Sequence, residues 1–185
     1  MINEVLEEAR QEMGKAIEAL HKDLSALRTG RASTALVDKL MVEYYGTPTL
    51  LQELALVSIP EAQLIAIKPY DPGAMKNIER AIMQSDLGLT PNNDGKLIRL
   101  QIPSLTEERR RELTKTASKR VEEAKVTIRN IRRSHLEDLR NFEKEKMITE
   151  DDLYSGRDEM QKLTDEYIKK IDEIGAAKEK EILEI

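Results

Sequence analysis

The chain has 185 residues, no cysteine, 3% aromatic residues and a formal net charge of −5. The lack of cysteine excludes disulfides and thiolate chemistry, and two histidines cannot build a zinc site unaided. So few aromatic residues argue against a large globular core and favour slender helical packing, in one large domain or two small ones.

The N-terminus carries acids where a signal peptide would carry basic residues, and the chain has no long apolar run. We therefore expect a soluble, cytoplasmic protein that makes no membrane contact. We also expect no cofactor and no metal.

Residues 3–29 are predicted to form the first helix, because apolar residues recur there at spacings of three and four. Asn3 can cap its start. The helix is expected to end at Thr29-Gly30, with Gly30 in the left-handed conformation that closes many helices.

The pattern then changes to short strands, and residues 31–104 are predicted to form a compact α+β module. The residues at 45–48 are expected to end its first strand, and those at 60–62 to turn a hairpin. The predicted elements are strands at 39–44, 55–59, 63–68, 87–89 and 97–102 and a helix at 74–84.

The longest helical pattern runs through residues 105–147, which contain neither Gly nor Pro. Thr106 can cap its start, and Glu107 and Glu108 suit the positive end of the helix dipole. Its apolar residues fill about 80° of the helix surface. They are Leu113, Ala117, Val121, Ala124, Ile128, Ile131, Leu139 and Phe142.

Beside this apolar stripe lies an arc of about 100° that is rich in basic residues. Residues 105–147 carry 13 basic and 9 acidic side chains, whereas residues 148–185 carry 6 and 12. The charge is thus segregated along the chain, and the net negative charge hides a basic helix. We call the residues of this arc the basic face: Arg111, Lys115, Lys125, Arg129, Arg132, Arg133 and Arg140.

Most charged helix faces are simply solvated and are paired with acids three or four residues away. For Arg129, Arg132 and Arg133, Glu137 is the sole acid expected to pair within the helix, although acids of the third helix offer a second possibility. Arginine suits bidentate phosphate contact. The residues alone therefore favour a sequence-independent grip on RNA phosphates.

A third helix is predicted over residues 149–184, where Thr149 and Asp152 fit a capping box and Ile148 can pack on Leu153. Its apolar stripe lies opposite a heavily acidic face.

Three amphipathic helices can bury their stripes only by packing together. The economical interpretation is a bundle of residues 1–30 and 105–185, with residues 31–104 inserted after its first helix. Two chain crossings then join the domains and form a candidate hinge. The hinge residues are Gly30, Arg31, Pro103, Ser104 and Leu105.

No catalytic constellation is found in the sequence, so we expect the protein not to be an enzyme. The Asp151-Asp152 pair is better explained by helix capping. His135 falls in the apolar arc and is expected to be partly buried and hydrogen-bonded, whereas His21 is expected to be solvated. Tyr44 and Tyr45 could stack on nucleic-acid bases. At the end of a strand, however, we expect one of the two rings to pack into the hydrophobic core.

Several ordered motifs, spread from end to end, resemble the bacterial ribosome recycling factor family. They are Leu-Arg-Thr-Gly-Arg-Ala-Ser at 27–33, Val-Glu-Tyr-Tyr-Gly-Thr-Pro at 42–48, Ser-Asp-Leu-Gly-Leu at 85–89, Leu-Thr-Glu-Glu-Arg-Arg at 105–110, Val-Thr-Ile-Arg-Asn-Ile-Arg-Arg at 126–133, Glu-Asp-Asp at 150–152 and Gln-Lys-Leu-Thr-Asp at 161–165.

The resemblance implies an α+β fold, an elongated three-helix bundle with a small inserted α+β domain that swings on its two links. It implies an L-shaped, roughly tRNA-sized monomer that binds the ribosome after termination. With the GTPase elongation factor G and its GTP, such a protein splits the subunits and releases mRNA and tRNA. The bundle would lie on large-subunit rRNA through Arg28, Arg110, Arg129, Arg132 and Arg133.

The main alternative is a helical adaptor or chaperone-like module that binds proteins without contacting RNA. It predicts that charge reversal on the basic face leaves partner binding intact. An RNA-modifying enzyme is disfavoured by the missing chemistry.

Overall fold

The computed structural model describes residues 1–184, which divide into two compact units. The helical unit consists of Met1–Thr29 and Glu107–Glu184, and the sheet unit is Gly30–Thr106. Within the described residues, none of the helices combines the length and the apolar character needed to cross a membrane.

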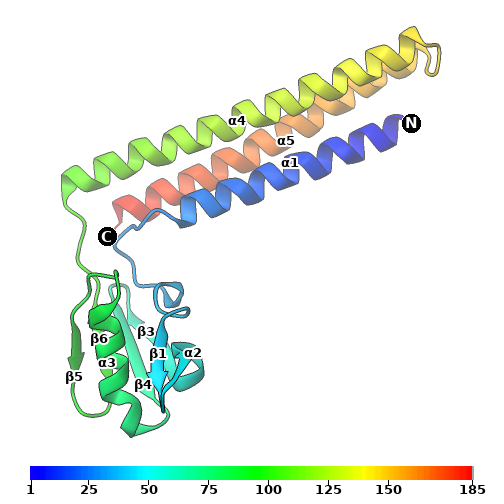
Figure 1. The fold of residues 1–185 in the computed structure, drawn as a ribbon. Coiled ribbons are helices and arrows are strands. Elements are labelled where there is room, and N and C mark those ends of the chain that lie inside the picture. The colour runs from blue at the N-terminus through cyan, green and yellow to red at the C-terminus, as the bar shows by residue number, and fades with distance from the viewer. Residues whose placement is uncertain (185) are drawn as a thin grey trace. The chain divides into compact units, whose positions relative to one another are not determined.

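Three helices lie side by side in the helical unit: α1 (Ile2–Ser25), α4 (Glu107–Lys144) and α5 (Glu150–Leu183) (Figure 1). Each buries one stripe against the other two. The largest fully buried side chains come from all three helices and are Met13, Ile128, Leu139, Met160 and Ile171. Together with the sheet unit, this bundle confirms the predicted α+β class.

The start of α5 carries the predicted capping box. The Asp152 N–H donates to Thr149 Oγ1 at 3.1 Å, and the Thr149 N–H donates to Asp152 Oδ2 at 3.0 Å. Two amide donors that the helix leaves unpaired are satisfied in this way.

The ends of α1 differ from the prediction. Asn3 lies inside the first turn, because α1 begins at Ile2, and Met1 occupies the cap position. The helix stops at Ser25, so Gly30 does not close it, although Gly30 has a φ of +78°. Beyond the helix, the Thr29 hydroxyl donates to Glu181 Oε1 of α5 at 2.8 Å, a tertiary contact that helical periodicity does not report.

The sheet unit contains a hairpin, a four-stranded antiparallel sheet and two α-helices. The sheet has the order β3-β4-β6-β5, and the hairpin pairs β1 with β2. The strands are β1 (Met41–Tyr44), β2 (Thr47–Leu50), β3 (Ala55–Glu61), β4 (Leu64–Pro69), β5 (Pro91–Asn93) and β6 (Ile98–Gln101). The helices are α2 (Leu51–Leu54), α3 (Met75–Gln84) and two 3₁₀ turns at Thr34–Leu36 and Pro72–Ala74.

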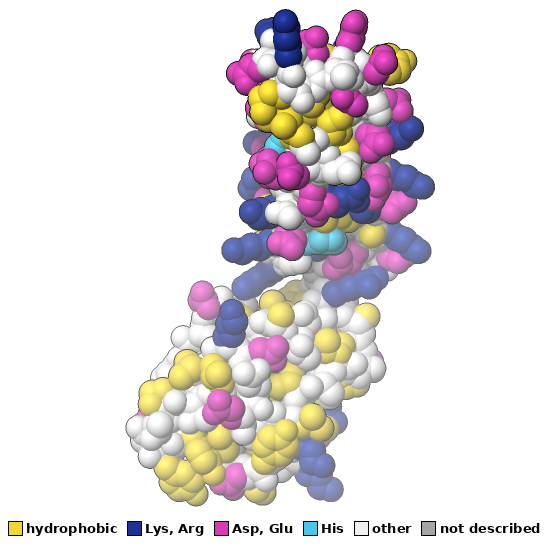
Figure 2. Space-filling model, turned by 90° about the vertical axis from the view of Figure 1, so that its right-hand side faces the viewer, with side chains coloured by type: hydrophobic (Ala, Val, Ile, Leu, Met, Phe, Trp, Pro, Cys, Tyr) yellow, Lys and Arg dark blue, Asp and Glu magenta, His cyan; other side chains and the backbone are white. Residues whose placement is uncertain are grey.

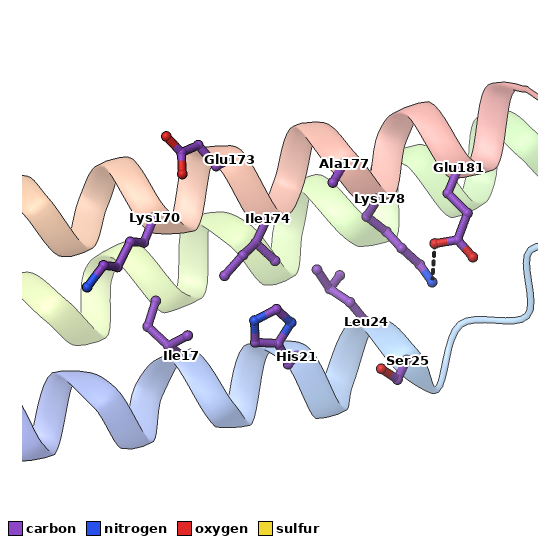
Figure 3. A pocket seen from close by; sticks show the side chains of 10 residues that line it. All are labelled: Ile17, His21, Leu24, Ser25, Lys170, Glu173, Ile174, Ala177, Lys178 and Glu181. Carbon is purple, nitrogen blue, oxygen red and sulfur yellow. Dashed lines mark ion pairs between the residues drawn. The ribbon is translucent and has the colours of Figure 1, made fainter. Parts of the chain in front are cut away.

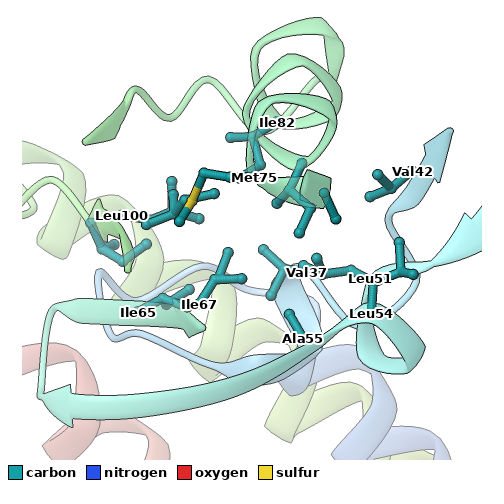
Figure 4. Packing of buried hydrophobic residues seen from close by; sticks show 14 residues of the cluster. Val37, Val42, Leu51, Leu54, Ala55, Ile65, Ile67, Met75, Ile82 and Leu100 are labelled. Atoms are coloured by element: carbon teal, nitrogen blue, oxygen red, sulfur yellow. The ribbon is translucent and has the colours of Figure 1, made fainter. Parts of the chain in front are cut away.

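The core of this unit lies between α3 and the sheet (Figure 4). Ile65 and Ile67 of β4 and Leu100 of β6 point toward Ile82 of α3. These side chains are essentially inaccessible to solvent, so the unit has a hydrophobic core of its own.

The first strand ends at Tyr44, as predicted, but one feature of this unit was not foreseen and one prediction was wrong. Tyr45 and Gly46 both have positive φ and turn the chain directly into β2, which contains Thr47 and Pro48. A two-residue turn of this kind matches the twist of the paired strands. Residues 87–89 form no strand, and the edge strand is instead β5, which pairs with β6. Tyr44 packs against the core while Tyr45 is 84% exposed, as expected of one core ring.

Two carboxylates organise the loops of the sheet unit. Asp71 accepts the Gly73 N–H at 2.8 Å and the Tyr44 hydroxyl at 2.8 Å, which holds its pKa below the ordinary 3.8 and raises the pKa of Tyr44 to about 12. Asp94 accepts the N–H groups of Leu97 and Lys96 and pairs with Arg99, so its pKa is also lowered.

The sheet unit is therefore expected to lose stability in acid. Because the folded-state pKa of both carboxyls lies below the unfolded value, their contribution is present above about pH 4 and is lost as the pH falls through the folded-state values. Urea unfolding of the sheet unit at pH 7 and at about pH 3 measures this loss. Asp71→Asn should flatten the dependence, whereas an unchanged urea midpoint in the unsubstituted chain would contradict it.

Candidate nucleic-acid interface

The apolar stripe and the basic face of α4 occupy different surroundings. Five of the eight stripe residues are buried in the bundle, and Val121, Ile131 and Phe142 are half-buried. Most of the basic face is exposed, and two members, Lys125 and Arg132, are half-buried toward α5. Acidic and basic side chains are interspersed on the face of the helical unit seen in Figure 2. The sign of the surface charge alone therefore does not define an interface. The cations of the basic face differ instead in whether an acidic side chain pairs with them.

Three members of the basic face have an acidic partner. Arg111 lies 2.6 Å from Glu107, and Arg129 lies 3.4 Å from Glu122. For Arg129, the expectation that Glu137 is the sole acid able to pair within the helix was wrong, because an extended arginine can reach an acid two turns away. Lys125 pairs with Asp172 of α5 at 2.5 Å, so the third helix does supply one acid. The two exposed pairs, of Arg111 and Arg129, each contribute less than about 1 kcal/mol.

Arg132 is held differently. Its Nη1 donates to Gln161 Oε1 of α5 at 2.9 Å, and Gln161 Nε2 donates to Asp165 Oδ1 at 2.8 Å. The amide orients the guanidinium without neutralising it. Gln161 is named in the sequence analysis only as part of the motif at 161–165 and is assigned no role there. A contact between two helices produces no local sequence pattern from which this role could be predicted.

The remaining cations of the basic face are uncompensated. Among residues 1–184, Lys115, Arg133 and Arg140 have no ion pair, and all three are exposed. Arg133 directly follows Arg132 on the helix. The structure thus brings Arg129, Arg132 and Arg133 together within about one helical turn, and within residues 1–184 Arg132 and Arg133 have no ion pair.

Arg110 and Arg28 do not belong to this cluster. Arg110 lies about 28 Å from Arg129 along the axis of α4. Its Nη1 donates to the Leu183 carbonyl at 3.3 Å, while its Nε is buried without a hydrogen bond to any described residue. Arg28 is exposed beyond the end of α1.

Three of the candidate hinge residues, Gly30, Pro103 and Leu105, lie close together. A Cβ on Gly30 would lie 3.2 Å from Leu105 Cγ and 3.5 Å from the Pro103 carbonyl oxygen, so the two links pass side by side here. Together with the φ of +78°, this close approach explains the glycine.

His135 is more deeply buried than the partly buried position predicted for it, and it makes no hydrogen bond within residues 1–184. Its Nε2 lies 3.5 Å from Glu12 Oε2, and its Nδ1 lies 3.6 Å from Asp138 Oδ2. The predicted hydrogen bond was therefore wrong, because the nearby carboxylates lie beyond suitable geometry.

A groove of about 520 Å³ lies between α1 and α5 (Figure 3). Ile17, Leu24 and Ile174 line it, and Lys178 pairs with Glu181 at 3.4 Å. His21 is exposed, as expected, and turns toward the groove. No group of three or more His, Asp or Glu residues in the described part of the chain could hold a metal ion.

Comparison with known proteins identifies the family. A family model described as ribosome recycling factor matches residues 20–183. The chain belongs to the ribosome recycling factor family.

Relatives of the family match the chain over its whole length. The ribosome-recycling factor of Oleidesulfovibrio alaskensis is 55% identical over 181 residues, 98% of either chain, and that of Halalkalibacterium halodurans is 55% identical over 185 residues, all of both chains. The family consists of translation factors that are not enzymes.

Solved structures of ribosome recycling factors resemble the fold. A solution structure is 42% identical, covers 100% of this chain and 98% of its own, and has a TM-score of 0.74. A second structure presents the T. thermophilus ribosome recycling factor and E. coli elongation factor G bound to the E. coli post-termination complex. Its recycling factor is 43% identical over 99% of both chains, with a TM-score of 0.63.

Proposed function

We propose that this chain recycles ribosomes after termination. It binds the post-termination complex and, with elongation factor G and GTP, splits the ribosomal subunits and releases mRNA and tRNA. The observation that carries this function is the match over 99% of the chain to a recycling factor bound with elongation factor G to that complex. The chain itself catalyses no bond chemistry, and the GTP belongs to its partner.

The helical unit binds large-subunit rRNA through Arg28, Arg110, Arg129, Arg132 and Arg133. Support comes from the pairing pattern on α4, where Arg132 is oriented by a neutral amide and Arg133 has no ion pair within residues 1–184. A charged donor that is oriented but not neutralised gains most from a phosphate. Such contacts hold the factor on RNA without reading its sequence.

The sheet unit moves relative to the helical unit when the GTPase acts. Each unit has its own core, and within residues 1–184 the chain crosses between them twice, near Gly30 and near Thr106. Few crossings and separate cores permit reorientation without unfolding. The protein works in the cytoplasm as a monomer.

A subunit-splitting assay tests this function. Purified chain, elongation factor G and GTP are mixed with post-termination ribosomes, and light scattering follows dissociation. We expect rapid splitting only when all three are present, because the factor supplies binding and leverage while GTP hydrolysis supplies the free energy. No acceleration over the GTPase alone would refute recycling and would favour the protein-binding adaptor.

A further inference from the structure

The side chains beside Arg132 form a chain of two hydrogen bonds that reaches from α4 onto α5. Arg132 Nη1 donates to Gln161 Oε1 at 2.9 Å, and Gln161 Nε2 donates to Asp165 Oδ1 at 2.8 Å. Gln161 and Asp165 lie four residues apart on α5, a spacing that places them on one face of the helix. The Gln161 amide therefore lies between the guanidinium of α4 and a carboxylate of α5.

These two bonds fix the direction in which the Gln161 amide points. A guanidinium can only donate hydrogen bonds, and an ionised carboxylate can only accept them. The amide therefore turns its oxygen toward Arg132 and its nitrogen toward Asp165, because the reverse orientation would lose both bonds. Asp165 thus determines that an acceptor faces Arg132.

This arrangement orients Arg132 while keeping its charge. Two turns earlier on α4, Lys125 pairs with Asp172 of α5 at 2.5 Å, so a carboxylate compensates that cation. At Arg132, α5 supplies a neutral amide instead. Gln161 and Asp165 are exposed, and exposed groups exchange these bonds for equally available bonds to water. The main effect of the two bonds is therefore on the position of the guanidinium rather than on the stability of the bundle.

We propose that Gln161 is a positioning residue for the contact of Arg132 with ribosomal RNA, and that Asp165 acts through Gln161. A free arginine side chain samples many rotamers, so holding it in place before binding removes part of the entropy cost of the contact. The contact is prepared by α5, although the cation belongs to α4. This inference rests on the proposed function, because it concerns how the chain binds the ribosome.

The mobility of the Arg132 guanidinium in the free protein is the first readout, measured by nitrogen relaxation at Nε. Gln161→Leu keeps a side chain of similar size but removes both hydrogen bonds. It should lower the Nε order parameter of Arg132 to that of the exposed Arg133. Asp165→Ala should lower it partway, because the amide can still accept a bond but no longer has a fixed direction. The urea midpoint of the helical unit should stay unchanged in both variants.

Ribosome affinity separates orientation from charge. Gln161→Leu should weaken binding about 3- to 10-fold with an unchanged salt slope, because Arg132 keeps its charge but loses its orientation. Gln161→Glu should keep Arg132 ordered yet weaken binding at least as much, with a slope smaller by about 0.7–0.9, because the new carboxylate pairs with the guanidinium. Gln11→Leu, the same change at an exposed position of α1, is the matched control and should alter neither quantity.

A double-variant cycle tests whether Gln161 acts through Arg132. In a chain that already carries Arg132→Ala, Gln161→Leu should cause no further loss of affinity. Losses that multiply would mean a structural role or a direct RNA contact of Gln161, and would overturn the inference. An unchanged Arg132 order parameter in Gln161→Leu would overturn it as well. A mobile Arg132 in that variant, together with an unsubstituted chain that binds no ribosomes, would instead refute the proposed function.

Discussion

Replacing Arg132 by alanine lowers the affinity for the ribosome by about tenfold or more. The Arg132 guanidinium bonds to the neutral Gln161 amide, so its charge is available to a phosphate. A hydrogen bond to a charged group contributes about 1.5–3 kcal/mol, which is about 10- to 100-fold in Kd. The affinity measured between about 50 and 200 mM salt should also fall less steeply, with a slope smaller by about 0.7–0.9.

Arg120→Ala is the matched control for this experiment. Arg120 is an exposed arginine of the same helix that lies outside the basic face and pairs with Glu123 at 3.3 Å. Its removal should change Kd by less than about twofold. An Arg132→Ala variant with the affinity and salt slope of the unsubstituted chain would rule out phosphate contact at this position.

Arg129→Ala should have a smaller effect than Arg132→Ala. Arg129 already lies 3.4 Å from Glu122, so part of its charge is compensated before RNA binds. The affinity loss should be roughly half that of Arg132→Ala on a logarithmic scale. Equal losses would mean that the ion pair opens on the ribosome at no cost.

Ile67→Ala destabilises the sheet unit by about 3 kcal/mol and leaves the helical unit intact. Ile67 is fully buried in β4 between Val57 and Ile98, and removing a buried side chain leaves both lost transfer energy and a cavity. Because the units have separate cores, only amides of the sheet unit should lose protection. Residue-resolved hydrogen exchange across a urea series measures both units at once.

The functional result of Ile67→Ala follows from the division of work between the units. At temperatures where the sheet unit has melted, ribosome binding should persist while splitting is lost. Leu56→Ala, at a 55% exposed position on the neighbouring strand, is the control and should cost less than about 0.5 kcal/mol. Joint unfolding of both units, or loss of binding together with splitting, would contradict independent units.

Most of the secondary structure could be predicted from local patterns. The helices α4 and α5 follow from uninterrupted apolar periodicity, and the start of α5 follows from the Thr149–Asp152 capping box. The end of α1 could not be predicted, because Ala26–Arg28 continue the helical pattern of the sequence. In the structure the helix ends at Ser25, and Thr29 bonds to Glu181 of α5. The break after Tyr44 was predicted, but the two-residue hairpin turn at Tyr45-Gly46 was not, because tyrosine seldom adopts positive φ.

The candidate interface was predictable as a face but not residue by residue. Helical periodicity placed seven cations beside the buried stripe of α4. It did not show that Arg129 pairs with Glu122, or that Arg132 rests on Gln161. Those contacts depend on side-chain reach and on the approach of a second helix, which periodicity does not encode.

The sequence by itself determined the helices, the segregation of charge onto α4 and, through its motifs, the family, because these are written in local spacing and composition. Only the tertiary structure decided which cations stay uncompensated and where the links are anchored. Gln161 reaches Arg132, Glu181 holds Thr29, and the β3–β4 turn bonds Ala32 and Ile102. Each contact joins residues at least 29 positions apart, so it exists only once the chain has packed.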